Sequence, residues 1–274
     1  MTTIVLSERQ LCDLEMLLNG SYAPLQTYLN SADYHGVVNN FQLENGEFFP
    51  IPIVLDVSES ISRQLQVGTT VRLTNAENLP LAELSLEEIY QPDLEEECEK
   101  VLGTTDRNHP YVKFLLDRKE KTFYLSGALK KLADFLHSDF HAHRLTPVEA
   151  KAVIERYGWK RIVGFQTRNP MHRSHYEITR YLTEQVAKES GQKTGLLLTP
   201  TVGVTQECDI DYFTRVKCYI ALINRYKETG AHLCLLPLAM RMAGPREALL
   251  HAIVRRNYGC THFIIGRDNA GPSY

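Results

Sequence analysis

Residues 165–177 hold the densest group of chemically active side chains in this sequence. Their letters, FQTRNPMHRSHYE, bring two arginines and two histidines together between a buried-strand pattern at 161–165 and a helical pattern at 176–186. The N-terminus of a helix offers unpaired N–H groups and a partial positive charge, and both favour a bound anion. His172 and His175 are three positions apart, so on a helix they share a face. The stretch predicts an anion site with two imidazoles directed at it.

Two other interpretations of the histidines stay open. The HxxH spacing could be half of a metal site, but the HExxH metal motif places its histidines four apart and carries a glutamate. Here Arg173 and Ser174 lie between them, and an arginine beside a metal ligand repels the cation. The histidines could also be half-exposed residues without a role, as histidine often is. The density of Arg, Asn and His on one turn favours the anion site.

Composition limits the class of protein. With 274 residues, 43% of them hydrophobic and 23% charged, the chain has the balance of a globular protein and the length for two domains. A net charge of −3 gives no global basic field, so we expect no nucleic-acid partner. The start shows no apolar signal core, and no apolar run has membrane-spanning length, so we expect no membrane partner. Six scattered cysteines without a CxxC pair indicate buried thiols and a reducing cytoplasm.

The first half of the chain, to about residue 140, has a mixed, β-rich pattern. Asn45-Gly46 between two apolar runs is typical of a β-hairpin. Three further strands are predicted, at 53–57, 70–73 and 81–84. The acidic run 93–100 is typical of a solvated helical face.

From Thr146-Pro147, which signals a helix start, strand and helix patterns alternate. The predicted strands are 161–165, 196–198, 232–236 and 261–265, and the predicted helices are 171–187, 211–227 and 245–257. Strands without polar alternation are buried on both faces, which favours a parallel sheet covered by helices. Ligands of such sheets bind beyond the carboxyl ends of the strands. The Gln166 turn and the Gly266 loop each follow a strand, so we expect both on the same rim.

Three blocks resemble a known family. QTRNPMHRSH at 166–175 is similar to the QxRNPxHxxH signature of ATP sulfurylase, PLAMRMAGPREA at 237–248 is similar to an arginine-rich turn of that family, and GRDNAGP at 266–272 resembles its GRDHAGP loop. Amino-terminal blocks match as well, at 17–25, 33–34 and 51–53. The family continues beyond the third block, so the resemblance implies a chain that is carboxy-terminally truncated relative to it.

The resemblance implies an α/β fold with two domains. Residues 1–143 are expected to form a β-rich PUA-like domain, from which we infer no RNA binding. Residues 144–274 are expected to form a Rossmann-like adenylyltransferase domain that is incomplete at its carboxy end. The implied reaction converts ATP and sulfate to adenosine 5′-phosphosulfate and pyrophosphate, the first step of sulfate assimilation. Mg²⁺ is expected to accompany ATP or pyrophosphate, and the chain is expected to form a homo-oligomer.

The resemblance also implies roles for individual residues. Sulfate is expected to bind Gln166, Arg168 and the backbone N–H of Ala270. The residues expected to be catalytic are Thr167, Arg168, Asn169, His172 and His175. The residues expected to contact ATP are Gln166, Thr167, Arg168, Asn169, Gly266, Arg267, Asp268 and Asn269. No residue is expected to bind a metal directly.

Departures from the family and alternatives remain. Asn269 stands where the family usually has histidine, and Arg241 and Arg246 fit either ligand contacts or structural ion pairs. The alternative function is a non-catalytic homologue that binds nucleotides, anions or a partner. A nucleotidyltransferase with another acceptor fits the Gln-x-Arg pair less well. The presence of Gln166, Arg168, Asn169, His172 and His175 favours the enzyme, whereas Asn269 and the truncation favour the non-catalytic homologue.

Overall fold

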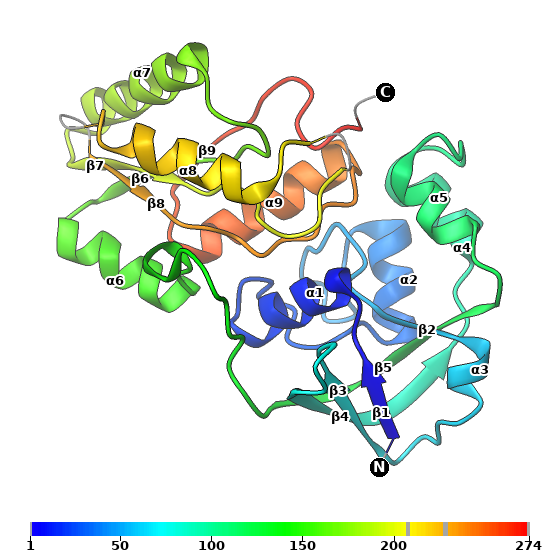
Figure 1. Ribbon diagram of the computed structural model, residues 1–274. Coiled ribbons are helices and arrows are strands. Elements are labelled where there is room, and N and C mark those ends of the chain that lie inside the picture. Colours follow the sequence, from blue (N-terminus) through cyan, green and yellow to red (C-terminus); the bar gives the residue numbers. More distant parts are fainter. Residues whose placement is uncertain (1, 207–208, 227–229, 273–274) are drawn as a thin grey trace. The chain divides into compact units, whose positions relative to one another are not determined.

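The computed structural model describes residues 2–206, 209–226 and 230–272 (Figure 1). The chain forms two compact units. The first unit comprises Met1–Leu136, Met240–His251 and Asp268–Tyr274, and the second comprises His137–Ala239 and Ala252–Arg267. Helix α9 (Pro245–Asn257) contributes to both. The expected domain division at residue 143 stays a prediction.

The first unit contains a five-stranded sheet in the order β1-β3-β4-β5-β2. Its strands are β1 (Thr2–Val5), β2 (Leu55–Ser58), β3 (Thr70–Thr74), β4 (Pro80–Tyr90) and β5 (Thr122–Lys131). Only the pair β1 and β3 is parallel among these neighbours. The strands predicted near β2, β3 and β4 are confirmed. The predicted hairpin at Asn45-Gly46 is wrong in extent, because the turn carries a single bridge, Gln42 to Phe48, and no extended strands.

Short helices make up much of the rest of the first unit: α1 (Glu8–Leu18), α2 (Ser31–Asn40), α3 (Glu59–Ser62), α4 (Leu94–Glu97), the π-helix η1 (Cys98–Leu102) and α5 (Pro110–Leu116). A capping box starts α1, since the Ser7 side chain accepts from the Gln10 N–H and the Gln10 side chain accepts from the Ser7 N–H. The β-rich prediction missed α1 because its buried face includes the polar residues Arg9, Gln10 and Asp13, which hide the apolar period.

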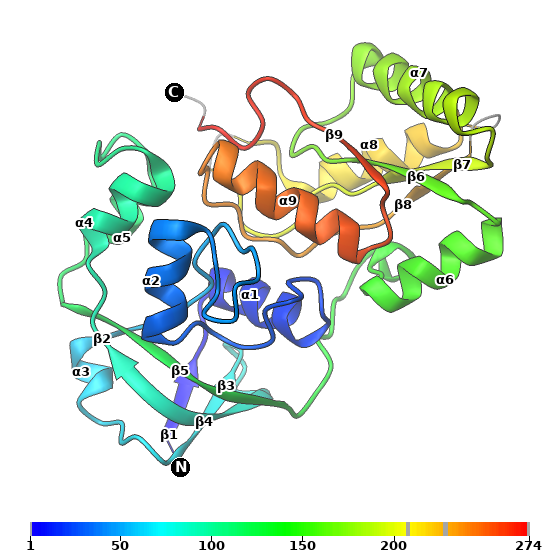
Figure 2. The same cartoon turned by 180° about the vertical axis from the view of Figure 1, so that it is seen from behind.

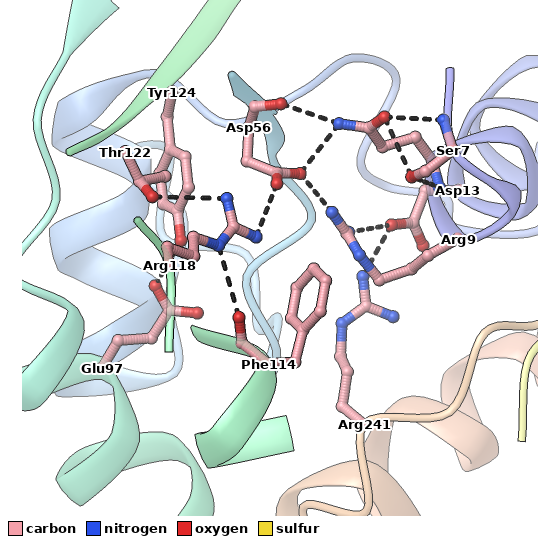
Figure 3. Close-up of polar contacts among 11 residues, drawn as sticks. Ser7, Arg9, Asp13, Asp56, Glu97, Phe114, Arg118, Thr122, Tyr124 and Arg241 are labelled. Carbon is pink, nitrogen blue, oxygen red and sulfur yellow. Dashed lines mark hydrogen bonds and ion pairs between the residues drawn. The ribbon is translucent and has the colours of Figure 1, made fainter. Parts of the chain in front are cut away.

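Buried ion pairs explain why polar residues occupy that face (Figure 3). Arg9 pairs with both Asp13 and Asp56, and Arg118 reaches Asp56 at 2.6 Å. Burial opposes ionisation of Asp56, but Arg9 and Arg118 outweigh it and lower the pKa of this carboxyl. Arg241 is 1% exposed and pairs with Asp13 at 2.8 Å. Of the two interpretations left open for Arg241, this contact supports the structural ion pair.

Arg246 likewise takes part in buried structural contacts within the first unit. Its guanidinium donates to the backbone carbonyls of Val37, Val38 and Lys100 at 2.7–3.0 Å. It also lies 3.8 Å from the centroid of the Phe41 ring, a cation–π geometry. These contacts use the guanidinium to satisfy backbone acceptors near the end of α2 and in η1.

The acidic run 93–100 is helical and exposes Asp93, Glu95, Glu99 and Lys100, as its charge predicts, but one of its carboxylates is buried. Glu97 is 3% exposed, and its carboxylate accepts from the hydroxyls of Tyr34 at 2.9 Å and Tyr124 at 2.8 Å. Burial raises the pKa of the Glu97 carboxyl, although the two tyrosine hydrogen bonds oppose the shift. At Glu97, the two tyrosine partners that the fold supplies allow a charged residue of the run to be buried.

The second unit is built on a four-stranded sheet in the order β8-β7-β6-β9, and all three pairs are parallel. The strands are β6 (Arg161–Phe165), β7 (Thr194–Leu198), β8 (Ala231–Leu233) and β9 (His262–Ile264). The expected parallel sheet is thereby confirmed. A 3₁₀ turn, η2 (His141–His143), precedes the helices α6 (Pro147–Tyr157), α7 (Arg173–Ser190) and α8 (Tyr212–Ile223).

Helices cover this sheet, and in Figures 1 and 2 the strands run between α7 and α6. A buried core joins the strands to α8, with Val163, Leu196 and Leu198 packed with Val216 and Tyr219. Close packing also explains a glycine in β7, because a Cβ on Gly195 would lie 2.0 Å from the Trp159 ring. Among the described residues, none of the helices is both long and apolar enough to cross a membrane.

We expect Glu97→Gln to gain stability relative to wild type as pH rises. The folded pKa of Glu97 lies above its unfolded value of about 4.3, so the folded state binds more protons and its free energy of unfolding falls as pH rises through that window. Glutamine does not titrate, so the variant does not lose this stability as pH rises. Urea unfolding between about pH 5 and about pH 8 measures the difference. The exposed neighbour Glu99, changed to Gln, is the matched control. A difference that stays flat or shrinks with pH would contradict the assignment.

Candidate active site

The turn between β6 and α7 holds the residues that the sequence singled out. β6 ends at Phe165 and α7 begins at Arg173, with His172 as its N-cap residue. Within the turn, the Asn169 N–H donates to Thr167 Oγ1 at 3.0 Å, and the Thr167 hydroxyl donates to the Asn169 carbonyl at 3.0 Å. This reciprocal pair fixes a tight polar turn directly after the strand. The predicted position on a strand-to-helix turn is confirmed.

Gln166 and Arg168 are both fixed by neighbours in the second unit. Gln166 is 8% exposed, and its Nε2 donates to Thr201 Oγ1 at 3.3 Å. Arg168 Nε lies 3.3 Å from Asp209 Oδ1, and the side chains are 13% and 6% exposed. The Gln206 N–H also donates to Asp209, at 3.2 Å. The guanidinium therefore has its direction set by a carboxylate that the loop itself orients.

The two histidines come together as the sequence predicts. The rings of His172 and His175 stack with centroids 3.8 Å apart and an interplanar angle of 28°. Burial, and then the nearby His172, lower the pKa of His175. His175 Nδ1 is buried and has no hydrogen-bond partner among the described residues. Ser174 Oγ lies 2.7 Å from His172 Nδ1, which fixes the direction of that ring.

The GRDNAGP loop follows β9 and is divided between the units. Gly266 and Arg267 are exposed and belong to the second unit. Asp268, Asn269 and Ala270 belong to the first. Asn269 Nδ2 is buried and without a hydrogen-bond partner in the part of the chain that the structure describes.

Ala270 adopts a left-handed backbone, with φ of 57°, and its carbonyl accepts from the Gly244 N–H at 3.1 Å. The predicted roles of the whole loop stay predictions, as does a shared rim with the Gln166 turn.

Four further residues contact the turn and were not predicted from the sequence: Thr201, Asp209, Arg215 and Tyr219. Arg215 and Tyr219 are four positions apart on α8, so they share a helix face. An arginine on an otherwise apolar, buried helix face is the one signal that sequence reading could have used. Asp209 and Thr201 lie in a loop after β7 without a recognisable pattern.

A further set of buried polar contacts connects the ends of β6 and β7. The Thr199 N–H and hydroxyl donate to the Phe165 carbonyl at 2.8 and 3.0 Å. Arg255, fully buried, donates from Nε to Thr199 Oγ1 and from Nη2 to the Thr199 carbonyl, both at 3.0 Å. These bonds set where the two strands end, and hence where the turn begins.

Chemically, the turn can bind an anion. It combines an amide donor, a guanidinium, two imidazoles and the N-terminus of an 18-residue helix. Arginine donates two parallel hydrogen bonds to tetrahedral oxyanions. No group of three or more His, Cys, Asp or Glu side chains suited to a metal ion occurs among the described residues.

Comparison with known proteins agrees with this geometry. Residues 141–274 match the ATP-sulfurylase family, and residues 1–134 match the PUA-like domain family. The chain is 49% identical over 271 residues to a sulfate adenylyltransferase of Schizosaccharomyces pombe, covering 98% of this chain and 54% of that relative. It is 48% identical over 272 residues to a sulfate adenylyltransferase of Gibberella zeae, covering 98% and 46%.

A solved structure is similar across the same range. The hexameric APS kinase from Thiobacillus denitrificans matches with a TM-score of 0.78 and 31% identity, over 98% of this chain and 48% of that one. The chain therefore spans about half the length of the relatives it matches. The expected fold class, a PUA-like domain followed by a parallel-sheet domain, is confirmed. Residues 141–274 belong to the ATP-sulfurylase family, and they follow a PUA-like domain.

Proposed function

We propose that this chain carries the sulfate adenylyltransferase site, which converts ATP and sulfate to adenosine 5′-phosphosulfate and pyrophosphate. The observation that carries the proposal is the single turn that holds Gln166, Arg168, His172 and His175 beside the start of α7. Relatives named sulfate adenylyltransferase support the same substrates. The non-catalytic alternative has no comparable observation in its favour.

In the proposed reaction, a sulfate oxygen forms a bond to the α-phosphorus of ATP. The bond from that phosphorus to the bridging oxygen breaks, and its electron pair leaves with pyrophosphate. Sulfate is fully ionised at neutral pH, so no proton has to be removed from the nucleophile. The barrier comes from bringing two anions together and from charge that builds at phosphorus, so positioning and electrostatic stabilisation dominate.

Each residue of the turn has a proposed role. Gln166 and Arg168 hold sulfate, with the Ala270 N–H as a further donor. Thr167 and Asn169 shape the turn and, with Gln166 and Arg168, contact ATP. His172 and His175 donate to the α-phosphate and the departing pyrophosphate. The lowered pKa of His175 keeps this imidazole neutral near pH 7, so its unpartnered ring nitrogen is available for a hydrogen bond.

The third block has the proposed role of binding the nucleotide. Gly266, Arg267, Asp268 and Asn269 are assigned to ATP. The buried, unpartnered amide of Asn269 supports this role, since a buried donor without a protein partner is costly unless a ligand or water satisfies it. Asparagine can also replace the donor capacity of the histidine that the family motif has at this position.

Mg²⁺, a homo-oligomeric state and a cytoplasmic location are also proposals. Mg²⁺ bound with ATP neutralises phosphate charge, and it is usually held by phosphate oxygens and water rather than by a protein cage. A hexameric relative supports self-association. Among the described residues, Cys98, Cys218, Cys234 and Cys260 are in no disulfide, which is consistent with a reducing compartment.

The test is pyrophosphate release from ATP that depends on sulfate, with molybdate as the alternative acceptor. It is run on this chain and on a chimera that adds the carboxy-terminal half of the Schizosaccharomyces pombe relative, since this chain spans 54% of it. We expect sulfate-dependent release from at least the chimera. If neither protein releases pyrophosphate but both bind ATP, the non-catalytic alternative holds.

We expect Arg168→Ala to reduce sulfate-dependent turnover on the order of a hundredfold, since a lost charge-assisted contact in a desolvated site costs roughly 3 kcal/mol. The variant should still fold, but its Tm should fall, because the Asp209 carboxylate, 6% exposed, loses its paired guanidinium. Steady-state kinetics with varied sulfate measures the change. Arg180→Ala, which removes an arginine paired with Glu177 and Glu184 on the same unit, is the control. Near-normal activity of Arg168→Ala would exclude it from the sulfate site.

We expect His172→Asn and His175→Asn to lower kcat while the KM for ATP changes by only a few-fold. Hydrogen bonds to the α-phosphate gain strength as charge builds in the transition state, so their loss appears in kcat. A rise in KM alone would assign the histidines to ground-state ATP binding. In the same variants, His172→Asn should raise the pKa of His175, because His172 contributes to lowering it. Titration of the ring by NMR checks that shift.

A further inference from the structure

One face of α8 is bonded to the backbone of the active-site turn. Arg215 Nη1 donates to the Arg168 carbonyl at 2.6 Å and to the Thr201 carbonyl at 3.1 Å. One helical turn further on, the Tyr219 hydroxyl donates to the Asn169 carbonyl at 2.5 Å. Arg215 is 2% exposed and Tyr219 is 1% exposed. Two deeply buried donors therefore converge on consecutive peptide groups of the turn.

Arg215 Nη1 and the Tyr219 hydroxyl donate to carbonyl oxygens of the turn and of Thr201. Arg215 Nε is buried without a hydrogen-bond partner among the described residues, and Tyr219 packs in the hydrophobic core with Val163, Leu198 and Val216. The carbonyls they hold belong to Arg168 and Asn169. The Asn169 N–H donates to Thr167 Oγ1, so the Arg168 guanidinium is the charged donor that these two residues offer to the proposed anion. Fixing these carbonyls fixes the planes of the two peptide groups that follow Arg168 and Asn169, and with them the backbone from which the Arg168 side chain extends. Residue 170 is proline, so the second of these peptide groups has no N–H.

We propose that Arg215 and Tyr219 are positioning residues for sulfate activation: they hold the Arg168 and Asn169 peptides so that the turn presents its donors in the geometry of the bound anion. The proposal rests on the proposed function for its kinetic consequence. Its structural part, that α8 rigidifies the turn, stands on the contacts alone.

The turn needs such support because regular secondary structure does not fix its backbone. Residues 166–172 lie between β6 and α7, so neither a sheet ladder nor an α-helix fixes their backbone. The internal Thr167 and Asn169 bonds close the turn on itself but do not attach it to the sheet. Arg215 makes that attachment, because one nitrogen bridges the turn to Thr201 after the end of β7. A site that must hold its donors within a fraction of an ångström needs this support.

Charge contributes to the same end. Arg215 carries a guanidinium that stays protonated in proteins, and it lies behind the turn on the side away from solvent. Asp209 and Asp211 are the acidic groups that act on it, and Arg168 is the neighbouring cation. A lysine at 215 would keep the charge but replace a planar fork by a single ammonium, so it separates charge from geometry.

Tyr219→Phe is the central test, because it removes one hydroxyl and leaves the ring in the core. The matched control is Tyr226→Phe. Tyr226 is 3% exposed, lies in the same core and bonds through its hydroxyl to Thr179 Oγ1 at 2.8 Å, without contacting the turn. We expect Tyr219→Phe to lower kcat/KM for sulfate about tenfold and Tyr226→Phe to change it less than about twofold, since each loses one hydrogen bond but only one bond positions the site.

Thermal unfolding of the two variants checks that the loss is not general. Comparable losses in Tm with unequal losses in kcat/KM support positioning. Equal kinetic losses in both variants, or none in Tyr219→Phe, would overturn it. Arg215→Lys, measured in the same way, keeps the positive charge but removes the planar guanidinium. A loss of kcat/KM similar to that of Tyr219→Phe would show that the geometry of the guanidinium is needed. Wild-type kcat/KM would overturn its role as a positioning residue.

Amide hydrogen exchange gives a readout that does not depend on turnover. In peptides covering residues 166–172, Tyr219→Phe should exchange faster than wild type, and Tyr226→Phe should not. Unchanged exchange in Tyr219→Phe would overturn the clamp even if activity fell. If the wild-type chain and its chimera show no sulfate-dependent turnover, the proposed function fails, and the exchange comparison still decides whether α8 holds the turn.

Discussion

The second unit depends on satisfying the backbone carbonyls at the carboxyl ends of its parallel strands. Where β6 and β7 stop, the sheet no longer supplies donors, yet the carbonyls of Phe165, Arg168, Asn169, Thr199 and Thr201 must still find them. Each is hydrogen-bonded by a side chain from elsewhere in the same unit: Thr199, Arg215, Tyr219 and Arg255. The same bonds that avoid a buried, unpaired acceptor also fix the turn on which the proposed chemistry depends.

The first unit solves a related problem with charges. Asp13, Asp56 and Glu97 are carboxylates removed from water, and each has arginine or tyrosine donors directed at it. The pKa values of Asp56 and Glu97 move in opposite directions for a physical reason: the arginines beside Asp56 outweigh its burial, whereas Glu97 has neutral hydroxyl partners and burial prevails. Removing an arginine from one of the buried ion pairs of Asp13 or Asp56 leaves a buried charge without its partner, which typically costs about 3–5 kcal/mol.

Sequence patterns predicted those parts whose signal is local. β6 and β7 are apolar runs buried on both faces, and α7 follows a polar turn, so both could be located from the letters alone. Arg215 and Tyr219 could not be assigned to the turn, because their partners lie 47 and 50 positions away and are carbonyl oxygens, which every residue has. Glu97 was misread for the same reason, since only the fold brings Tyr34 and Tyr124 to it. Local patterns report which face is apolar; they do not report what a buried polar group bonds to.

The electrostatics of the turn follow from these contacts. The chain carries a net charge of −3, so any attraction for an anion must be local. Around the turn, the guanidiniums of Arg168 and Arg215 interact with the carboxylates of Asp209 and Asp211, and the N-terminus of α7 adds a partial positive charge. Asp209 orients Arg168 through Nε before an anion binds, so part of the entropy of ordering this long side chain is already spent in folding. A carboxylate near an anion site therefore need not oppose binding. It weakens the electrostatic attraction for the anion, but by holding an arginine in place it fixes the geometry of the donor. The buried guanidinium of Arg215 offsets part of the negative charge of that carboxylate.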